Sequence, residues 1–490
     1  VGGKTMIYTN SQEQTVYRSL ASQIQLGFYE DGERFPSAQE IARRYQISYC
    51  PAQRALKLLE NDGLIRLCRG KETSVLRKPY DDYLNSTIFF SRIEALDDLN
   101  RSLKLISSPI CFQGLCAAGN GGNEKQFMEI YGCAHPGKRL YRLFVQALCA
   151  LGSRSALNLY YDIGAFTESA FLDILNKLYG ENGAELLLSQ FSDSFLQSMR
   201  DCRERRLKEG RNRLNEMQDA FFEKTGRYFE PAKKKCREKR QTSFLWEPNK
   251  GRNRYCDVIA VDLLRKIGQG IHPVGTLFPS NAVLADIYHV SEMTIRRTVG
   301  LMNQLGVSET RNGVGTRVVS AGDESTPYKM KSLMSNNKFI CFLEALQLLA
   351  ITGKPVLAYT FPHCPAESLG AISRAAGIKV QYAAVNATVG ALLQAAARHC
   401  PLAAIREIYS KITLLLLFGS ILQIRGGEYG RFPGWPEISR NICESLEEGD
   451  GIRLAASADT LFKNCFAVMK EKLLELGIAG ADKVYTPFDI

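Results

Sequence analysis

The sequence predicts a mainly α-helical chain in which a small helical module with a two-stranded β hairpin occurs twice, each time followed by an all-helical domain. Residues 15–76 and 254–319 follow one common pattern, and the segments after them carry apolar residues at helical spacing. This order also predicts an internal duplication. The predicted domains are residues 8–78, 80–245, 252–320 and 325–490. A length of 490 residues suits several domains of about 100–200 residues.

Each copy of the repeat begins with an amphipathic helix that is expected to open on a tyrosine, Tyr17 in the first copy and Tyr255 in the second. A loop follows and ends in Phe-Pro-Ser. Ser37 and Ser280 close these loops, where an N-cap belongs, and Glu40 completes a capping box in the first copy. A short helix with an apolar face comes next.

A second serine in each copy, Ser48 or Ser291, is expected to cap the following helix, whose apolar residues recur at the spacing of one buried face. Each copy then continues through a strand, a glycine turn and a second strand that contains Val75 or Val318. From the Phe-Pro-Ser prolines to these valines, the copies keep a constant offset of 243 residues without a gap. This order of elements predicts two winged helix-turn-helix domains.

The charge of the chain favours an anionic partner. Its formal net charge is +11 and its pI is about 8.9. Most of the excess lies in residues 200–240, which hold 15 Lys/Arg and 8 Asp/Glu. The ordinary explanation is a solvated helix face or linker, and the alternative is an accessory segment that contacts phosphates.

Cysteine and histidine usage indicates a cytoplasmic protein that needs no metal. Fourteen cysteines are scattered without paired spacing, as expected in a reducing compartment, and there are only five histidines. The most apolar run, residues 412–424, is too short to span a bilayer and is expected to form a buried helix, so no membrane role is predicted. No nucleophile elbow, P-loop or metal motif occurs; we therefore expect no enzyme activity, catalytic residue, metal or cofactor.

The repeated pattern resembles the DNA-binding domain of the GntR family of bacterial transcriptional regulators, over about a quarter of the chain. In the first copy the matching residues are Pro36-Ser37, Ile41-Ala42, Ser48, Ala55-Leu56, Leu59-Glu60, Gly63-Leu64-Ile65, Gly70, Thr73 and Val75. In the second copy they are Pro279-Ser280, Leu284-Ala285, Val290-Ser291, Thr294-Ile295-Arg296, Gly306, Gly313, Gly315-Thr316 and Val318.

The resemblance implies a regulator that binds double-stranded DNA by placing the start of one helix of each module in the major groove. The residues expected to reach bases are Tyr49, Cys50, Gln53 and Arg54 in the first copy, and Glu292, Met293, Thr294, Arg296 and Arg297 in the second. Ser37 and Ser280 are expected to donate to phosphates, and the other residues expected to take part in DNA binding are Gln39, Ser48 and Ser291. The wing-tip residues expected at the backbone or minor groove are Arg69, Lys71, Arg311 and Arg317.

The same resemblance implies that a helical domain binds a small effector, which controls the DNA-binding modules. A site with an Asp and three His, known in one branch of the family, is excluded because the first helical segment contains only His135. A homodimer would carry four DNA-binding modules. The alternative is an architectural or interaction protein in which one or both winged helices serve packing or non-specific DNA binding. The operator, the effector, the direction of regulation, the oligomeric state and whether both copies contact DNA stay open.

Overall fold

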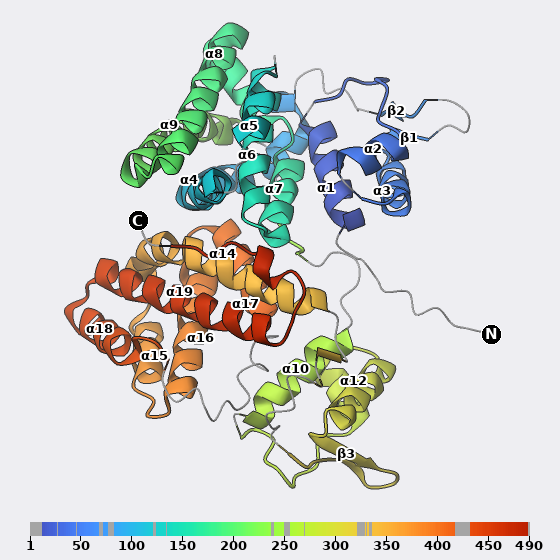
Figure 1. Cartoon of the computed structure of the whole chain (residues 1–490), viewed down its shortest axis with the longest axis vertical. Coiled ribbons are helices and arrows are strands. Elements are labelled where there is room, and N and C mark those ends of the chain that lie inside the picture. Colours follow the sequence, from blue (N-terminus) through green and yellow to red (C-terminus); the bar gives the residue numbers. More distant parts are fainter. Residues whose placement is uncertain are drawn as a thin grey trace. The chain divides into compact units, whose positions relative to one another are not determined.

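The computed structural model of the chain describes residues 12–26, 28–45, 47–67, 72–76, 83–120, 124–133, 135–236, 240–248, 255–268, 270–320, 329, 331–332, 336–416 and 432–488. Over these residues the chain is mainly helical, and its β structure consists of two antiparallel hairpins (Figure 1). It divides into two compact units. Unit 1 contains residues 1–248 with the short segments 402–407 and 489–490, and unit 2 contains residues 249–401 and 408–488.

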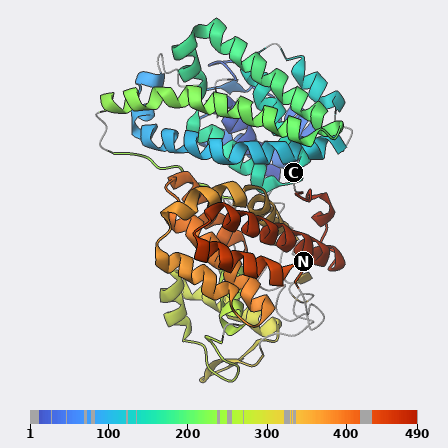
Figure 2. The same cartoon turned by 90° about the vertical axis from the view of Figure 1, so that its left-hand side faces the viewer.

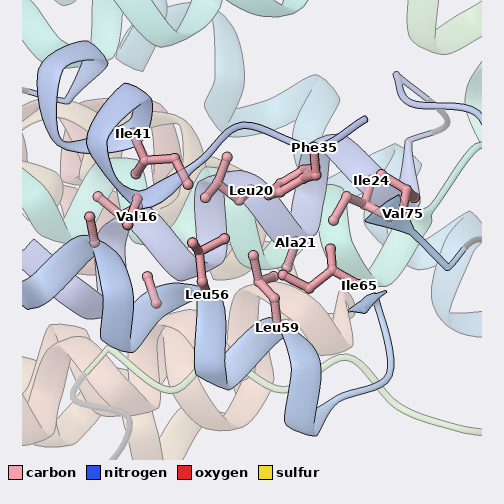
Figure 3. Packing of buried hydrophobic residues seen from close by; sticks show 13 residues of the cluster. Val16, Leu20, Ala21, Ile24, Phe35, Ile41, Leu56, Leu59, Ile65 and Val75 are labelled. Atoms are coloured by element: carbon pink, nitrogen blue, oxygen red, sulfur yellow. The ribbon is translucent and has the colours of Figure 1, made fainter. Parts of the chain in front are cut away.

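Unit 1 begins with a small domain of three helices and one hairpin, which we call the 12–75 domain. Its elements are α1 (Gln12–Gln25), α2 (Ala38–Arg44), α3 (Tyr49–Asn61), β1 (Ile65–Arg66) and β2 (Ser74–Val75). Buried residues from all three helices, the loop before α2 and the hairpin meet in one core (Figure 3). Leu20, Ile41 and Leu59 come from the three helices, and none of them is exposed.

Unit 2 begins with the same order of elements, which we call the 255–318 module. These are α10 (Tyr255–Gly268), α11 (Asn281–Tyr288), α12 (Glu292–Gln304), β3 (Ser308–Arg311) and β4 (Gly315–Val318). Each helix of this module starts 243 residues after its counterpart in the 12–75 domain. The constant offset predicted from the Phe-Pro-Ser prolines to Val75 and Val318 therefore also holds for the first helix of each segment.

The expectation that both first helices open on tyrosine was wrong for the first copy. Helix α1 begins at Gln12, so Tyr17 lies inside the helix, and the counterpart of Tyr255 is Gln12. The buried face sets this register, because Leu20 and Leu263 are the equivalent core residues and both are fully buried. The prediction had wrongly aligned Tyr17 with Tyr255.

Backbone hydrogen bonds also recur at equivalent positions in the two segments. The Phe35 amide donates to the Thr73 carbonyl at 2.7 Å, and the Phe278 amide donates to the Thr316 carbonyl at 2.8 Å. These bonds join the loop before the second helix to the returning strand of the hairpin. Both hairpins pair their strands in the same antiparallel register.

A glycine matched in the two copies ends the third helix of each. Gly63 has φ 70° and Gly306 has φ 74°, a left-handed conformation in which a side chain would be strained. The glycines that supported the repeat in the sequence therefore occupy positions with the same conformational demand.

The rest of unit 1 is helical, as predicted. Its elements are η1 (Tyr83–Asn85), α4 (Thr87–Asn120), α5 (Glu124–Tyr131), α6 (Pro136–Ala150), α7 (Arg154–Thr167), α8 (Ala170–Arg203) and α9 (Leu207–Lys235). Helices α4, α8 and α9 pack along one another (Figure 2). Helix α8 is broken at Gly180, whose φ of 70° is not helical.

The predicted basic stretch 200–240 falls mainly on the end of α8 and on α9, and residues 237–239 lie outside the described residues. Several of its cations pair with carboxylates of the same helical domain. Asp201 accepts from Arg206 at 2.7 Å and from Arg213 at 3.3 Å, and Lys233 contacts Asp97. These pairs favour the explanation of a solvated helix face over a segment reserved for phosphates.

The rest of unit 2 is also helical. Its elements are α14 (Asn336–Thr360), η2 (Phe361–His363), α15 (Ala366–Ala376), α16 (Gln381–His399), α17 (Ala403–Leu416, of which residues 408–416 belong to unit 2), α18 (Trp435–Glu448), α19 (Gly451–Glu475) and η4 (Ala481–Lys483). Helices α14 and α19 pack side by side.

These helices bear on the predictions that the chain has no membrane role and that residues 412–424 form a buried helix. The segment 338–363 is long and apolar enough to cross a membrane, but 78% of its most apolar window is buried inside the protein, as expected for a core helix. Of the predicted buried run 412–424, residues 412–416 lie in α17, and the remainder falls outside the described residues.

Candidate nucleic-acid interface

Helix α3 of the 12–75 domain presents a polar face to solvent because its apolar face is used in the core. Ala52, Ala55, Leu56 and Leu59 are buried. The predicted base-reading residues of the first copy, which are all exposed, are Tyr49, Cys50, Gln53 and Arg54. Helical periodicity therefore brings these four side chains together on one accessible surface.

The predicted capping box at the start of α2 is confirmed. The Ser37 hydroxyl accepts from the Glu40 amide at 3.3 Å, and the Glu40 carboxylate accepts from the Ser37 amide at 2.7 Å. These bonds, together with Arg34 at 3.0 Å, lower the pKa of Glu40 to about 2. Since the Ser37 hydroxyl acts as an acceptor in the cap, its proton stays available to a phosphate oxygen. Gln39 is exposed beside it.

The serines before the third helix of each copy also occupy the N-cap position, but their side chains differ. The Ser291 hydroxyl accepts from the Thr294 amide at 3.3 Å and lies 3.0 Å from the Thr294 hydroxyl. Ser48 makes no capping hydrogen bond through its side chain. Ser280 caps α11 by accepting from the Val283 amide at 3.3 Å.

Helix α12 of the 255–318 module exposes most of its predicted site residues. Glu292, Met293, Arg296 and Arg297 are exposed, whereas Thr294 is half-buried. The Arg296 guanidinium lies 3.8 Å from the Glu292 carboxylate, one turn earlier on the same face. An exposed pair of this kind is weak, so Arg296 can exchange the carboxylate for another acceptor at little cost.

Arg54 in the first copy has a comparable partner, since its guanidinium lies 3.3 Å from the Glu13 carboxylate of α1. On the second hairpin, Arg311 and Arg317 are exposed, and Arg311 lies 3.4 Å from the carboxylate of Glu309. The wing residues Arg69 and Lys71 lie outside the described residues.

Sequence reasoning missed two cations on α2, of which Arg44 hydrogen-bonds to Tyr29 and lies near Tyr141 of α6. Arg43 and Arg44 occupy the last turn of α2, and both are exposed. Their counterparts on α11, at the same offset, are Asp286 and Ile287. A count of exposed cations on both helices of the first helix-turn-helix pair would have found them. The 12–75 domain is therefore the more basic of the two at this position.

The 255–318 module instead exposes apolar side chains near its α11–α12 surface. Four of them are between 46% and 55% exposed: Leu277, Val283, Ile287 and Met293. Val283 and Ile287 lie one turn apart on the same face of α11. The equivalent residues of the 12–75 domain are Arg34, Glu40, Arg44 and Cys50. The two copies thus share a backbone but differ in the chemistry of the corresponding surface.

The 12–75 domain is joined to the helical part of unit 1 through α1, which packs against α7 and leaves the α3 face free. A buried ion pair lies at this joint. The Arg18 guanidinium donates to the Asp162 carboxylate at 2.9 Å, and it also donates to the Glu247 carbonyl. The Phe28 ring, which follows α1, meets the Tyr141 ring edge to face at 5.2 Å.

Comparisons with known proteins bear on the 12–75 domain. The sequence profile described as "Bacterial regulatory proteins, gntR family" matches residues 12–75. No curated protein matches the chain.

Among solved structures, Streptococcus agalactiae GntR is 16% identical, with 43% of this chain and 99% of that chain covered and a TM-score of 0.21. E. coli McbR/YncC is 15% identical over 43% of this chain and 94% of its own, with a TM-score of 0.21. Listeria monocytogenes Lar is 13% identical over 46% and 100%, with a TM-score of 0.17. TM-scores this low establish no common overall architecture. The profile match and the geometry of α1–α3 with the β1–β2 hairpin identify residues 12–75 as a winged helix-turn-helix DNA-binding domain of the GntR family.

Proposed function

We propose that this protein is a sequence-specific DNA-binding transcriptional regulator whose affinity for its operator is controlled by a small effector bound in a helical domain. One observation carries the proposal: the GntR-family 12–75 domain leaves the N-terminal face of α3 accessible, with Gln53 and Arg54 side by side on it. Glutamine pairs well with adenine and arginine with guanine, so this face can read bases in the major groove.

We propose further that the 255–318 module is a second winged helix-turn-helix domain. Its helices and hairpin lie at a constant offset from those of the first, and Arg296 and Arg297 occupy the positions of Gln53 and Arg54. Because these residues differ, the two modules would prefer different base sequences. One chain would then recognise a site with two unlike halves.

The test compares equivalent substitutions in the two copies. Genomic fragments are selected with the purified full chain and with the Gln53→Ala, Arg54→Ala, Arg296→Ala and Arg297→Ala variants. Loss of a base contact should weaken specific binding by about 1–3 kcal/mol and relax the selected sequence at one position. Arg440→Ala on α18, which removes one exposed cation far along the chain, is the control and should leave the selected sequence unchanged. A chain that selects no sequence before any substitution contradicts the proposal.

A second function for the 255–318 module is favoured by its exposed apolar residues. Burying Leu277, Val283 and Ile287 against protein would be favourable, at about 25 cal/mol per Å² of apolar surface. In this alternative the module is a packing or dimerisation element, and only the 12–75 domain reads DNA. The module then serves to bring two copies of the chain together.

These alternatives are separated by giving the module the residues of its counterpart. The double variant Val283→Glu/Ile287→Arg carries the side chains that Glu40 and Arg44 provide in the first copy. If the module dimerises, light scattering should show this variant shifted to monomer while its selected DNA sequence is unchanged. If the module reads DNA, the oligomeric state should stay the same, and Arg296→Ala should alter the selected sequence.

A further inference from the structure

A cavity of about 190 Å³ lies inside unit 1, among the helices of its helical domain. Its walls come from α4, α6, α7, α8 and α9, with two further residues that belong to the 12–75 domain, Leu26 and Phe28. A cavity of roughly 150 Å³ lined by Leu, Ile and Phe in another protein stays dry and binds benzene. The space here is therefore sufficient for a ring system somewhat larger than benzene.

The lining of the cavity excludes a charged ligand. Leucine, isoleucine and aromatic side chains dominate it, and none of the described residues that line it carries a charge. An ionised carboxylate or amine placed there would lose its hydration without gaining a counter-ion, which costs several kcal/mol. The ligand class that this cavity fits is thus neutral and largely apolar.

Two wall residues, Gln218 and Tyr141, have a buried polar atom without a hydrogen-bond partner among the described residues. The Tyr141 hydroxyl, however, also interacts with the hydroxyls of Ser22 and Ser19. Gln218 of α9 is only 3% exposed, and its Oε1 accepts from the Ser107 hydroxyl, which leaves Nε2 as the free end of the amide. Nε2 has no hydrogen-bond partner among the described residues. The Cys111 thiol interacts with this side chain, but burial raises the pKa of the thiol, and a protonated thiol is a weak acceptor. Nε2 can therefore donate to a ligand.

We propose that this cavity is a binding site for a neutral aromatic molecule of one or two fused rings that carries one hydrogen-bond acceptor, which Gln218 Nε2 recognises. We further propose that the ligand acts on the DNA-binding domain directly, because Phe28 and Leu26 form part of the wall. Phe28 follows α1, the helix that joins the 12–75 domain to α7, so filling the cavity holds this joint in place. The proposed effect of the ligand on DNA affinity rests on the proposed function, whereas the proposed ligand class does not.

The ligand class is tested by calorimetry on the full chain with three matched probes: quinoline, naphthalene and 2-naphthoate. Quinoline and naphthalene have the same shape, but only quinoline has an acceptor. Quinoline should bind about 2- to 10-fold more tightly than naphthalene, and the difference should vanish in Gln218→Met. The anion 2-naphthoate should not bind. Binding of 2-naphthoate as tight as that of quinoline, or no quinoline binding below about 1 mM, overturns the proposal.

The coupling is tested by hydrogen exchange, which does not depend on DNA. Bound quinoline should slow exchange of the α1 amides in the wild-type chain and in Phe144→Ala, which enlarges the cavity from a wall that belongs to the helical domain alone. In Phe28→Ala, quinoline should still bind but should no longer slow exchange in α1. Equal protection of α1 in both variants would refute the coupling.

The DNA readout then separates the two proposals. Saturating quinoline should change the affinity for a selected operator by at least about 5-fold in the wild-type chain and in Phe144→Ala, but not in Phe28→Ala. If the chain selects no operator, the proposed function fails, but calorimetry still tests the ligand class and hydrogen exchange still tests the coupling to α1. If the operator is selected but quinoline changes neither its affinity nor α1 exchange, the coupling proposal fails alone.

Discussion

Removing Asp162 should destabilise unit 1 strongly, because it leaves a buried guanidinium without its carboxylate. The Arg18 side chain is 3% exposed, and that of Asp162 is 16% exposed, with 2.9 Å between their charged atoms. Burial lowers the pKa of Arg18, and the Asp162 charge opposes this effect. Breaking a buried pair by deleting one partner costs about 3–5 kcal/mol. We expect about 3 kcal/mol for Asp162→Ala, since Arg18 keeps the Glu247 carbonyl as an acceptor.

The measurement is urea unfolding followed by the fluorescence of Trp246, which lies in unit 1. The second tryptophan, Trp435 of unit 2, is replaced by Phe in all variants so that the signal reports unit 1 alone. The double variant Arg18→Met/Asp162→Ala removes both charges and should recover at least about 2 kcal/mol. A loss below about 1 kcal/mol for Asp162→Ala, or no recovery in the double variant, would refute the view that the buried pair holds this joint.

Three further predictions concern close contacts and pH. A Cβ on Gly164 of α7 would lie 2.4 Å from the Ser22 hydroxyl, so Gly164→Ala should lower the urea midpoint of unfolding in the wild-type chain. In a Ser22→Ala background, where this hydroxyl is absent, the same substitution should raise the free energy of unfolding by up to about 1 kcal/mol. In unit 2, a Cβ on Gly353 would lie 2.5 Å from the buried Phe462 ring, and Gly353→Ala should cost about 1–3 kcal/mol in calorimetric unfolding. The pKa of Glu40 falls from 4.5 to about 2 on folding, so its stabilising effect is complete above the higher value and is lost as pH drops between the two. Acid titration of helicity should therefore show Glu40→Gln approaching wild-type stability only at the low end of that range.

The order of helices and strands in the 12–75 domain and in the 255–318 module was predictable because its signals are local. Serine caps, the left-handed glycines at Gly63 and Gly306, and the spacing of buried residues each act within a few residues, so one sequence is enough to find them. The start of α1 was missed although a local signal was present. Ser11 stands directly before the helix with Gln14 three residues later, which is the spacing of a capping box, but the match between the two tyrosines was followed instead.

The joint and the cavity could not be predicted, because their parts are distant in the sequence. Arg18 and Asp162 are 144 residues apart. Phe28 and Gln218 line the same cavity only because five helices pack around it. Nothing in the local pattern around Arg18 distinguishes a buried arginine from an exposed one, since position in an amphipathic helix gives only its approximate direction. The α3 and α12 faces were easier to predict, because exposure follows from which side of the helix the core takes.

The 12–75 domain and the 255–318 module differ at the contact through which the proposed ligand would act on DNA binding. Phe28 is 7% exposed and forms part of the cavity wall, whereas its counterpart in the second half, Ile271, is 57% exposed. Val261, the counterpart of Arg18, has no charge to pair. The repeated register therefore carries the helices and hairpin of the module, but not the contacts that tie α1 to its neighbour. A ligand signal that passes through this joint would reach the 12–75 domain and leave the 255–318 module unchanged, so the two halves of an operator would respond unequally to it.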